Sequence, residues 1–237
     1  MKSLLEDLQG LIERTYDLST GIEDVGAFVI GDEGLRVLYG DTPLLSRVPE
    51  GSHEAPEAPP IAAGAHPRTA RTLVRQQDGA LRLTLYYPDA LIAHLEAHPP
   101  LRALDERNVD EFAVFVEEVD HVLHIAHRLR AGQGITLLEL EWQANLTKAL
   151  MLRHLLARRL APRPLGGAEE HWVRYHLFEK FEYGGDEPEV AARYREAARL
   201  AVRMLDALEP LDPPARLASL RAFAHRSFPD KLRSLAV

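Results

Sequence analysis

The chain has 237 residues, no cysteine and a formal net charge of −8, and 46% of its residues are hydrophobic against 27% charged. This composition predicts a globular protein with a substantial core and argues against a disordered chain. The lack of cysteine excludes disulfides, thiolate nucleophiles, zinc fingers and iron–sulfur clusters. The net negative charge argues against a protein that binds nucleic acid or an anionic membrane surface, since both favour a basic partner.

The N-terminal segment, MKSLLEDLQGLIERTYDL, carries acidic residues early and lacks the apolar stretch of a secretory signal. No part of the sequence approaches the roughly 18 consecutive apolar residues that a membrane-spanning helix needs. We therefore expect a cytoplasmic protein with no membrane partner. The 28 basic residues are mostly arginine, a bias that indicates a GC-rich, bacterial genome.

The first elements along the chain are predicted to be a helix and a β-hairpin. Apolar residues in 3–17 recur at helical spacing. Segments 26–31 (GAFVIG) and 35–40 (LRVLYG) are short, rich in branched and aromatic residues and bounded by glycine. Because only three residues join these two segments, we expect them to pair as antiparallel strands.

A second hairpin is expected further along the chain. Residues 46–68 contain five prolines, which predicts a loop or linker. Segments 72–77 and 81–88 then flank Asp78-Gly79, a strong signal for a two-residue hairpin turn. Together these elements predict a small α+β region over residues 1–100.

The remainder, residues 101–237, predicts an α-helical bundle. Helical periodicity begins after Pro88 and is interrupted by segments rich in glycine and proline. The predicted helices span 89–97, 109–131, 137–160, 168–181, 187–208, 214–226 and 229–235. The predicted fold class is therefore α+β, predominantly α: an N-terminal helix with two antiparallel β-hairpins, followed by an α-helical bundle.

The helix predicted at 109–131 carries an unusual concentration of acids and histidines. Projected at about 100° per residue, its large apolar side chains form one stripe. Almost opposite this stripe lies a polar row with the spacing i, i+4, i+7 and i+11: Glu117, His121, His124 and Arg128. The projection directs Glu118 and Asp120 to other sides of the helix.

Carboxylate and imidazole groups on one helical face are the ligands that hold zinc or a similar divalent ion. The connection at 131–135 is short, so the helix predicted at 137–160 should pack antiparallel to the first. This arrangement brings Glu139 and Glu141 alongside the polar row, which makes Glu141 a candidate fourth ligand. The candidate metal ligands are therefore Glu117, His121, His124 and Glu141.

Other interpretations of the polar row remain open. It can be a solvated or partner-contacting face, since a helix with its core on one side has water on the other. It can be a buried structural network, in which every polar group has a partner. Glu139 or Glu141 can also form a plain salt bridge with Arg128. The segment Glu118–His121 has the Glu-x-x-His spacing of di-iron bundles, but the sequence lacks a second copy of that motif.

A basic surface on two later helices is a further candidate. Such a face would bind an anion or nucleic acid. Its arginines are Arg153, Arg158, Arg159, Arg195, Arg199 and Arg203. The alternative is that arginines near a helix C-terminus complement the helix dipole and pair with neighbouring glutamates.

No nucleotide-binding, nucleophile-elbow or HExxH motif occurs, so no catalytic residue is assigned and enzymatic activity stays an open question. The leading functional hypothesis is a non-enzymatic interaction or regulatory protein that contacts another protein or a second copy of itself through its helical surfaces. The alternative is a metal-binding helical bundle or metal-dependent enzyme that uses Glu117, His121 and His124, with a divalent metal as cofactor. The second alternative is a nucleic-acid-associated accessory protein.

Overall fold

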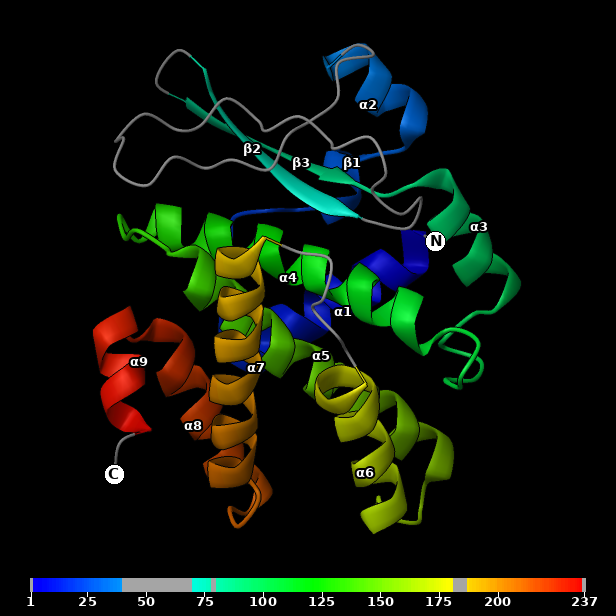
Figure 1. Cartoon of the computed structure of the whole chain (residues 1–237), viewed down its shortest axis with the longest axis vertical. Coiled ribbons are helices and arrows are strands. Elements are labelled where there is room, and N and C mark those ends of the chain that lie inside the picture. The colour runs from blue at the N-terminus through cyan, green and yellow to red at the C-terminus, as the bar shows by residue number, and fades with distance from the viewer. Residues whose placement is uncertain (1, 40–69, 78–79, 181–186, 236–237) are drawn as a thin grey trace.

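A computed structural model describes residues 2–39, 70–77, 80–180 and 187–235. The fold is predominantly helical, and a small three-stranded mixed sheet covers one side of the helices (Figure 1). This agrees with the predicted α+β class in which helices dominate. The predicted Pro-rich loop at 46–68 and the Asp78-Gly79 turn lie outside the described residues.

The sheet has the strand order β1-β3-β2, with β1 at Val29–Ile30, β2 at Arg71–Gln77 and β3 at Ala80–Tyr86. Strands β2 and β3 pair antiparallel over their whole length, which confirms the strand pairing predicted for the second hairpin. Strand β1 pairs with β3 in parallel. The mixed sheet therefore joins the N-terminal segment to a strand that comes some fifty residues later in the chain.

The first predicted hairpin is wrong. Its second segment is not a strand but part of helix α2 (Asp32–Tyr39), which follows a 3₁₀ turn at Val25–Phe28 and strand β1. Asp32 and Glu33 occupy the first turn of this helix, where negative charge complements the helix dipole. The branched and aromatic residues that predicted a strand are therefore overridden by the acidic helix start and by the parallel pairing of β1 with β3.

The helices predicted from periodicity are otherwise present with small shifts at their ends. They are α1 (Lys2–Tyr16), α3 (Asp89–Ala97), α4 (Val109–Arg130), α5 (Leu137–Leu160), α6 (Gly167–Arg174), α7 (Pro188–Leu208), α8 (Pro213–His225) and α9 (Phe228–Ser234). The helix predicted at 168–181 is divided, because α6 continues into a π-helical turn at Tyr175–Glu179.

Helix α4 lies at the centre of the fold. The sheet packs on one side of it, and α1 and α5 also pack against it (Figure 1). Two side chains of the sheet region bond to carbonyl groups of α4: the Tyr87 hydroxyl donates to Phe115 O at 2.7 Å, and Thr72 Oγ1 donates to Glu118 O at 3.2 Å. These two bonds attach the sheet to α4.

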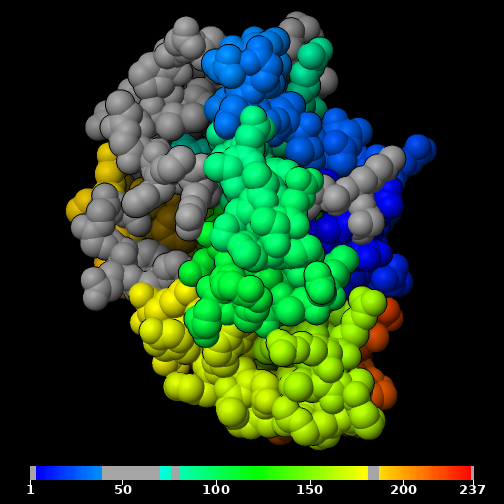
Figure 2. All heavy atoms as spheres, turned by 90° about the vertical axis from the view of Figure 1, so that its right-hand side faces the viewer, coloured from blue at the N-terminus to red at the C-terminus, as the bar shows by residue number. Residues whose placement is uncertain are grey.

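One hydrophobic core runs from α1 through α4 and α5 to the C-terminal helices. Figure 2 shows one face of the molecule, where the green segment around α3 lies between the blue α2 and the yellow-green end of α5 with α6. Within the described part of the chain, none of the helices combines the length and the apolar character needed to cross a bilayer.

The loop after α1 is attached to α4 through a histidine. The backbone N–H of Ser19 donates to Nδ1 of His127 at 3.1 Å, and the His225 ring lies edge-on to the His127 ring at 4.9 Å. Burial, together with the neighbouring His225 and His124, lowers the pKa of His127 from its ordinary 6.5. The Ser19 hydrogen bond requires the neutral ring, since a protonated Nδ1 cannot accept.

The stability of the protein should therefore depend on the protonation of His127. Below pH 6.5 the unfolded chain binds this proton and the folded chain resists it, so the free energy of unfolding falls as the pH drops through 6.5 toward the lowered pKa. The variant His127→Asn keeps an acceptor for Ser19 but has no such proton, so its stability should fall less. Urea unfolding between pH about 7.5 and about 5 measures this difference. An identical pH dependence in both proteins would contradict it.

Candidate metal site

Three of the four members of the polar row of α4 are buried, and the fourth, Glu117, is 19% exposed, contrary to the interpretation as a solvated face. The exposed fractions are 8% for His121, 1% for His124 and 3% for Arg128. Helix α5 packs along α4, and α7 packs in turn on α5. Buried polar groups need partners inside the fold, so each member of the row has to be accounted for.

Three members of the predicted ligand set meet between α4 and α5. One ligand atom each of Glu117, His121 and Glu141 lies within 4.8 Å of the other two. His121 Nε2 lies 3.9 Å from Glu141 Oε2, and both side chains are 10% exposed. Ligand atoms around one bound ion lie roughly 3–3.5 Å apart, given metal–ligand bonds of about 2.0–2.2 Å. Small side-chain movements would therefore close this group around a cation.

The α4–α5 connection sets this register. Helix α5 begins beside the short turn that ends α4, and the Thr136 side chain caps it by accepting a hydrogen bond from the Glu139 N–H at 3.1 Å. Counting away from the turn in opposite directions places Glu141 beside His124 and Arg128, and Asn145 near His121. The structure instead brings Glu141 Oε2 to 3.9 Å from His121 Nε2, about one helical turn beyond that count. The antiparallel packing predicted from the short connection therefore explains why α5 runs beside the polar row, and side-chain placement decides the exact partner of Glu141.

A further acidic group, Glu118, lies against the other nitrogen of His121. Its Oε2 lies 3.6 Å from His121 Nδ1, and the two side chains are each 10% exposed. A carboxylate at one imidazole nitrogen orients the ring and makes the other nitrogen a better ligand. Among the described residues, neither Glu118 Oε2 nor His121 Nε2 has a hydrogen-bond partner. The Glu-x-x-His spacing signals this contact, although the helical projection directs Glu118 elsewhere.

Lys148 completes the cluster, and the sequence interpretation missed it. Its Nζ donates to Glu117 Oε2 across the α4–α5 interface. Lys148 follows Glu141 by seven residues, or two helical turns, so the same face of α5 carries both. That spacing is the signal that could have identified it.

The charges in this cluster change one another's proton affinity. Burial alone would raise the pKa of Glu117, but the charges of Lys148 and His121 lower it overall. Burial would lower the pKa of His121, yet the adjacent carboxylates of Glu118 and Glu141 raise it to about 10. Burial raises the pKa of Glu141 to about 7. A cation that replaces the His121 proton would thus be surrounded by negatively charged carboxylates.

Helix α7 approaches the same cluster through Tyr194. Burial and the nearby charges of Glu141 and Glu117 raise the pKa of the Tyr194 hydroxyl, so this group stays protonated at neutral pH. The cluster therefore lies among three helices rather than two.

The structure places His124 apart from the other three candidate ligands. Its Nδ1 lies 3.1 Å from Asp120 Oδ1, and its ring lies edge-on to Tyr16 at 5.4 Å. The Thr147 hydroxyl lies 2.6 Å from the same Asp120 oxygen and 2.9 Å from the Tyr16 hydroxyl. His124 thus belongs to a separate buried network that connects α1, α4 and α5.

The fourth member of the row, Arg128, forms a salt bridge with Glu139, one of the two glutamates expected as its partner. Arg128 Nη2 donates to Glu139 Oε1 at 2.6 Å, and Lys231 Nζ of α9 lies 2.8 Å from the same oxygen. All three side chains are at most 3% exposed. The two acids of α5 thus have different roles, because Glu139 pairs with Arg128 and Glu141 faces His121.

The candidate basic surface is largely paired with neighbouring groups. Arg153 pairs with Glu170 at 2.6 Å, and Arg199 pairs with Glu196 at 2.6 Å. Arg159 donates to Leu104 O, and Arg203 donates to Leu235 O. The remaining two members, Arg158 and Arg195, are exposed. This pattern is typical of solvated helix surfaces with local ion pairs.

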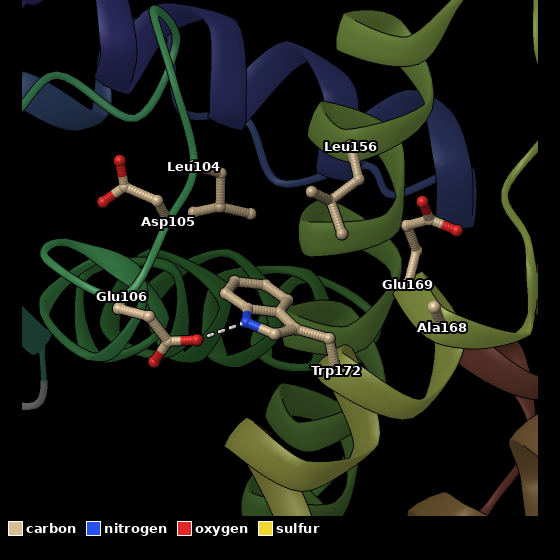
Figure 3. Close-up of a pocket in the computed structure, with 7 residues that line it drawn as sticks. All are labelled: Leu104, Asp105, Glu106, Leu156, Ala168, Glu169 and Trp172. Carbon is tan, nitrogen blue, oxygen red and sulfur yellow. Dashed lines mark hydrogen bonds between the residues drawn. The ribbon is translucent and has the colours of Figure 1, made fainter.

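A surface pocket of about 320 Å³ lies elsewhere, between the segment before α4, α5 and α6 (Figure 3). This volume is near the lower end for ligand pockets. Trp172 Nε1 donates to Glu106 Oε1 at 2.5 Å across it, while the other two lining acids pair with arginines: Asp105 with Arg107 and Glu169 with Arg163. Its polar groups are thus engaged, and none belongs to the Glu117–His121–Glu141 cluster.

Comparison of the chain with protein-family models, with curated proteins and with solved structures finds no match.

Proposed function

We propose that the protein binds a divalent transition-metal ion through Glu117, His121 and Glu141. The observation that carries the proposal is the unpartnered Nε2 of His121, which faces Glu141 inside the fold while Glu118 lies against Nδ1. An imidazole held by a carboxylate at one nitrogen and open at the other is the usual arrangement of a metal-bound histidine.

The types of ligand atom narrow the class of ion. One imidazole and two carboxylates, without a thiolate, suit Zn²⁺, Mn²⁺ or Fe²⁺ better than Cu⁺, which favours sulfur. Calcium takes six to eight oxygen ligands, and an imidazole in the set argues against it. The five side chains of the cluster are 10–19% exposed, which leaves a way for an ion to enter.

The number of protein ligands supports a reactive rather than a purely structural ion. Structural zinc sites have four protein ligands, whereas catalytic sites have three and keep a position for water or substrate. With Glu117, His121 and Glu141 as ligands, a fourth position stays open. A metal ion at such a position lowers the pKa of bound water or polarises a substrate oxygen. The proposed function is thus that of a metal-dependent protein with an open coordination position.

The competing interpretation is a metal-free buried ion network. Lys148 and a protonated His121 would then supply two positive charges against the carboxylates of Glu117, Glu118 and Glu141. Such a network would be expected to satisfy its buried polar atoms, yet Glu118 Oε2 and His121 Nε2 lack partners among the described residues. A metal ion would give His121 Nε2 the partner that it lacks.

Glu118→Gln should weaken metal binding by about 10- to 100-fold, because a neutral amide holds and polarises the imidazole less well than a carboxylate. Titration with Co²⁺, followed by its visible absorption, measures the affinity. Glu111→Gln is the matched control, since it removes a buried carboxylate from the same helix at a position outside the cluster. If wild type and Glu118→Gln bind Co²⁺ with equal affinity, Glu118 has no role in metal binding.

An interaction or regulatory role with another protein or a second copy, and a cytoplasmic location, stay predictions from the sequence. The proposed metal site is compatible with both, because a helical protein can use its surface for contact and its interior for a metal ion.

A further inference from the structure

Lys148 is an unusual neighbour for a cation site. It belongs to α5, as Glu141 does, and its ammonium group pairs with Glu117, one of the three proposed ligands. The Lys148 side chain is 13% exposed and that of Glu117 is 19% exposed. This ion pair is therefore shielded from water. Its two charges interact more strongly than they would at an exposed surface.

A metal ion and this ammonium group would compete for the same carboxylate. An ion held by Glu117, His121 and Glu141 would lie within a few ångströms of Lys148 Nζ, because Nζ already touches Glu117 Oε2. Two cations at such a distance repel each other, and the low-dielectric surroundings increase the repulsion. A flexible four-carbon stem allows a lysine to move its charge toward solvent, unlike a ligand fixed by the helix.

We propose that Lys148 is a resident counter-ion which a metal ion displaces from Glu117, so that its charge lowers metal affinity and makes metal loading reversible. This inference rests on the proposed metal-binding function. It adds a mode of regulation, since the affinity of the site is set by an internal competitor as well as by its ligands. Metal loading would also transfer a buried ammonium group to the protein surface.

The first part of the test compares metal affinities. Co²⁺ titrations would be run on wild type, Lys148→Met and Lys148→Arg, with Lys148→Gln as a second neutral variant should the methionine protein fold poorly. Methionine keeps most of the apolar stem and removes the charge, whereas arginine keeps the charge. We expect the neutral variants to bind Co²⁺ at least roughly tenfold more tightly than wild type, and Lys148→Arg to stay close to wild type.

The second part follows the lysine itself. The lysines of the chain are Lys2, Lys148, Lys180 and Lys231. Amine-reactive labelling followed by mass spectrometry reports each one separately. We expect Co²⁺ to accelerate the labelling of Lys148, while Lys180, which pairs with Asp110 on the surface, keeps its rate.

The outcomes separate this inference from the proposed function. If wild type binds Co²⁺ and the neutral variants bind it equally or more weakly, the role of Lys148 is overturned. The proposed metal site would still stand. An unchanged labelling rate on metal addition would overturn the displacement even if the affinities differ. Neutral variants that bind Co²⁺ when wild type does not would support the competition and overturn metal binding by the natural chain. Absence of binding in every protein would overturn both.

Discussion

Replacing Glu139 by alanine is expected to destabilise the folded chain by about 3–5 kcal/mol, the cost of removing one partner from a buried ion pair. Glu139 Oε1 holds both Arg128 and Lys231 in a part of the fold where all three side chains are at most 3% exposed. Its loss leaves two buried cations without their shared anion. Since small proteins are stable by about 5–15 kcal/mol, such a variant would be close to unfolding.

The position of Lys231 makes this effect larger than that of a simple pair. Lys231 comes from α9, so the cluster connects the C-terminal helix to α4 and α5. Its ammonium also lies 4.6 Å from the centre of the Phe223 ring of α8. Burial lowers the pKa of Lys231, while the charge of Glu139 opposes that shift. Without Glu139 the lysine would be driven toward its neutral form.

Urea unfolding of wild type and Glu139→Ala measures the effect directly. Glu196→Ala is the matched control, since Glu196 also pairs with an arginine but on the surface, and exposed pairs contribute roughly 0–1 kcal/mol. The double variant Glu139→Ala/Lys231→Met should recover part of the loss, because one unpaired cation is removed with the anion. A loss below about 1 kcal/mol in Glu139→Ala would show that the buried triad contributes little.

Replacing His121 by alanine is expected to abolish metal binding at micromolar ion concentrations. Changes at residues that only orient a ligand cost about 10- to 100-fold in affinity, and loss of the ligand itself should cost more. His121 supplies the sole nitrogen of the three-residue group. Glu141→Gln, which changes a carboxylate to an amide of the same shape, should weaken binding in the same direction while disturbing the packing less.

His124→Ala provides the decisive control for this prediction. The sequence places His124 in the same helical row as His121, but in the structure it faces Asp120 and Tyr16. Removing it should leave the metal affinity unchanged and reduce the stability, because Asp120 loses a buried partner. If His124→Ala loses the metal while His121→Ala binds it fully, then His124 and not His121 is the ligand.

Much of the candidate site could be predicted from the sequence because it depends on helix geometry. The repeat of 3.6 residues places Glu117 and His121 one turn apart on α4, and the short connection fixes the antiparallel register of α5. That register places Glu141 beside the polar row, although in the structure it meets His121 rather than His124 or Arg128. The same geometry predicts that Glu139 or Glu141 pairs with Arg128, and in the structure the partner is Glu139.

Helix geometry could not predict contacts that depend on side-chain direction or on distant segments of the chain. A projection treats side chains as radial lines, yet long side chains such as Glu118 lean along the helix and reach a neighbour one turn away. The spacing of His124 suits the row equally well, and its partners, Asp120 and Tyr16, decide its place. Lys231 joins Glu139 from the far end of the chain, which no local pattern reveals.

The first hairpin shows the same limit for strands. Branched and aromatic residues in 35–40 favour a strand by composition, but Asp32 and Glu33 start a helix in front of them. Strand β1 then pairs with β3, a partner some fifty residues away. The burial of the polar row likewise depends on how the sheet and α7 pack around α4 and α5, and this tertiary arrangement is not encoded in one helix.

The measurement that tests the central claim most directly is the metal content of wild-type protein. The chain would be purified without a histidine tag, supplemented in turn with Zn²⁺, Mn²⁺ and Fe²⁺, dialysed, and analysed by mass spectrometry beside His121→Ala and His124→Ala. We expect about one ion per chain in wild type and in His124→Ala, and none in His121→Ala. Wild type that retains none of the three ions after supplementation would contradict it, and Glu117, His121 and Glu141 would then form a structural ion network.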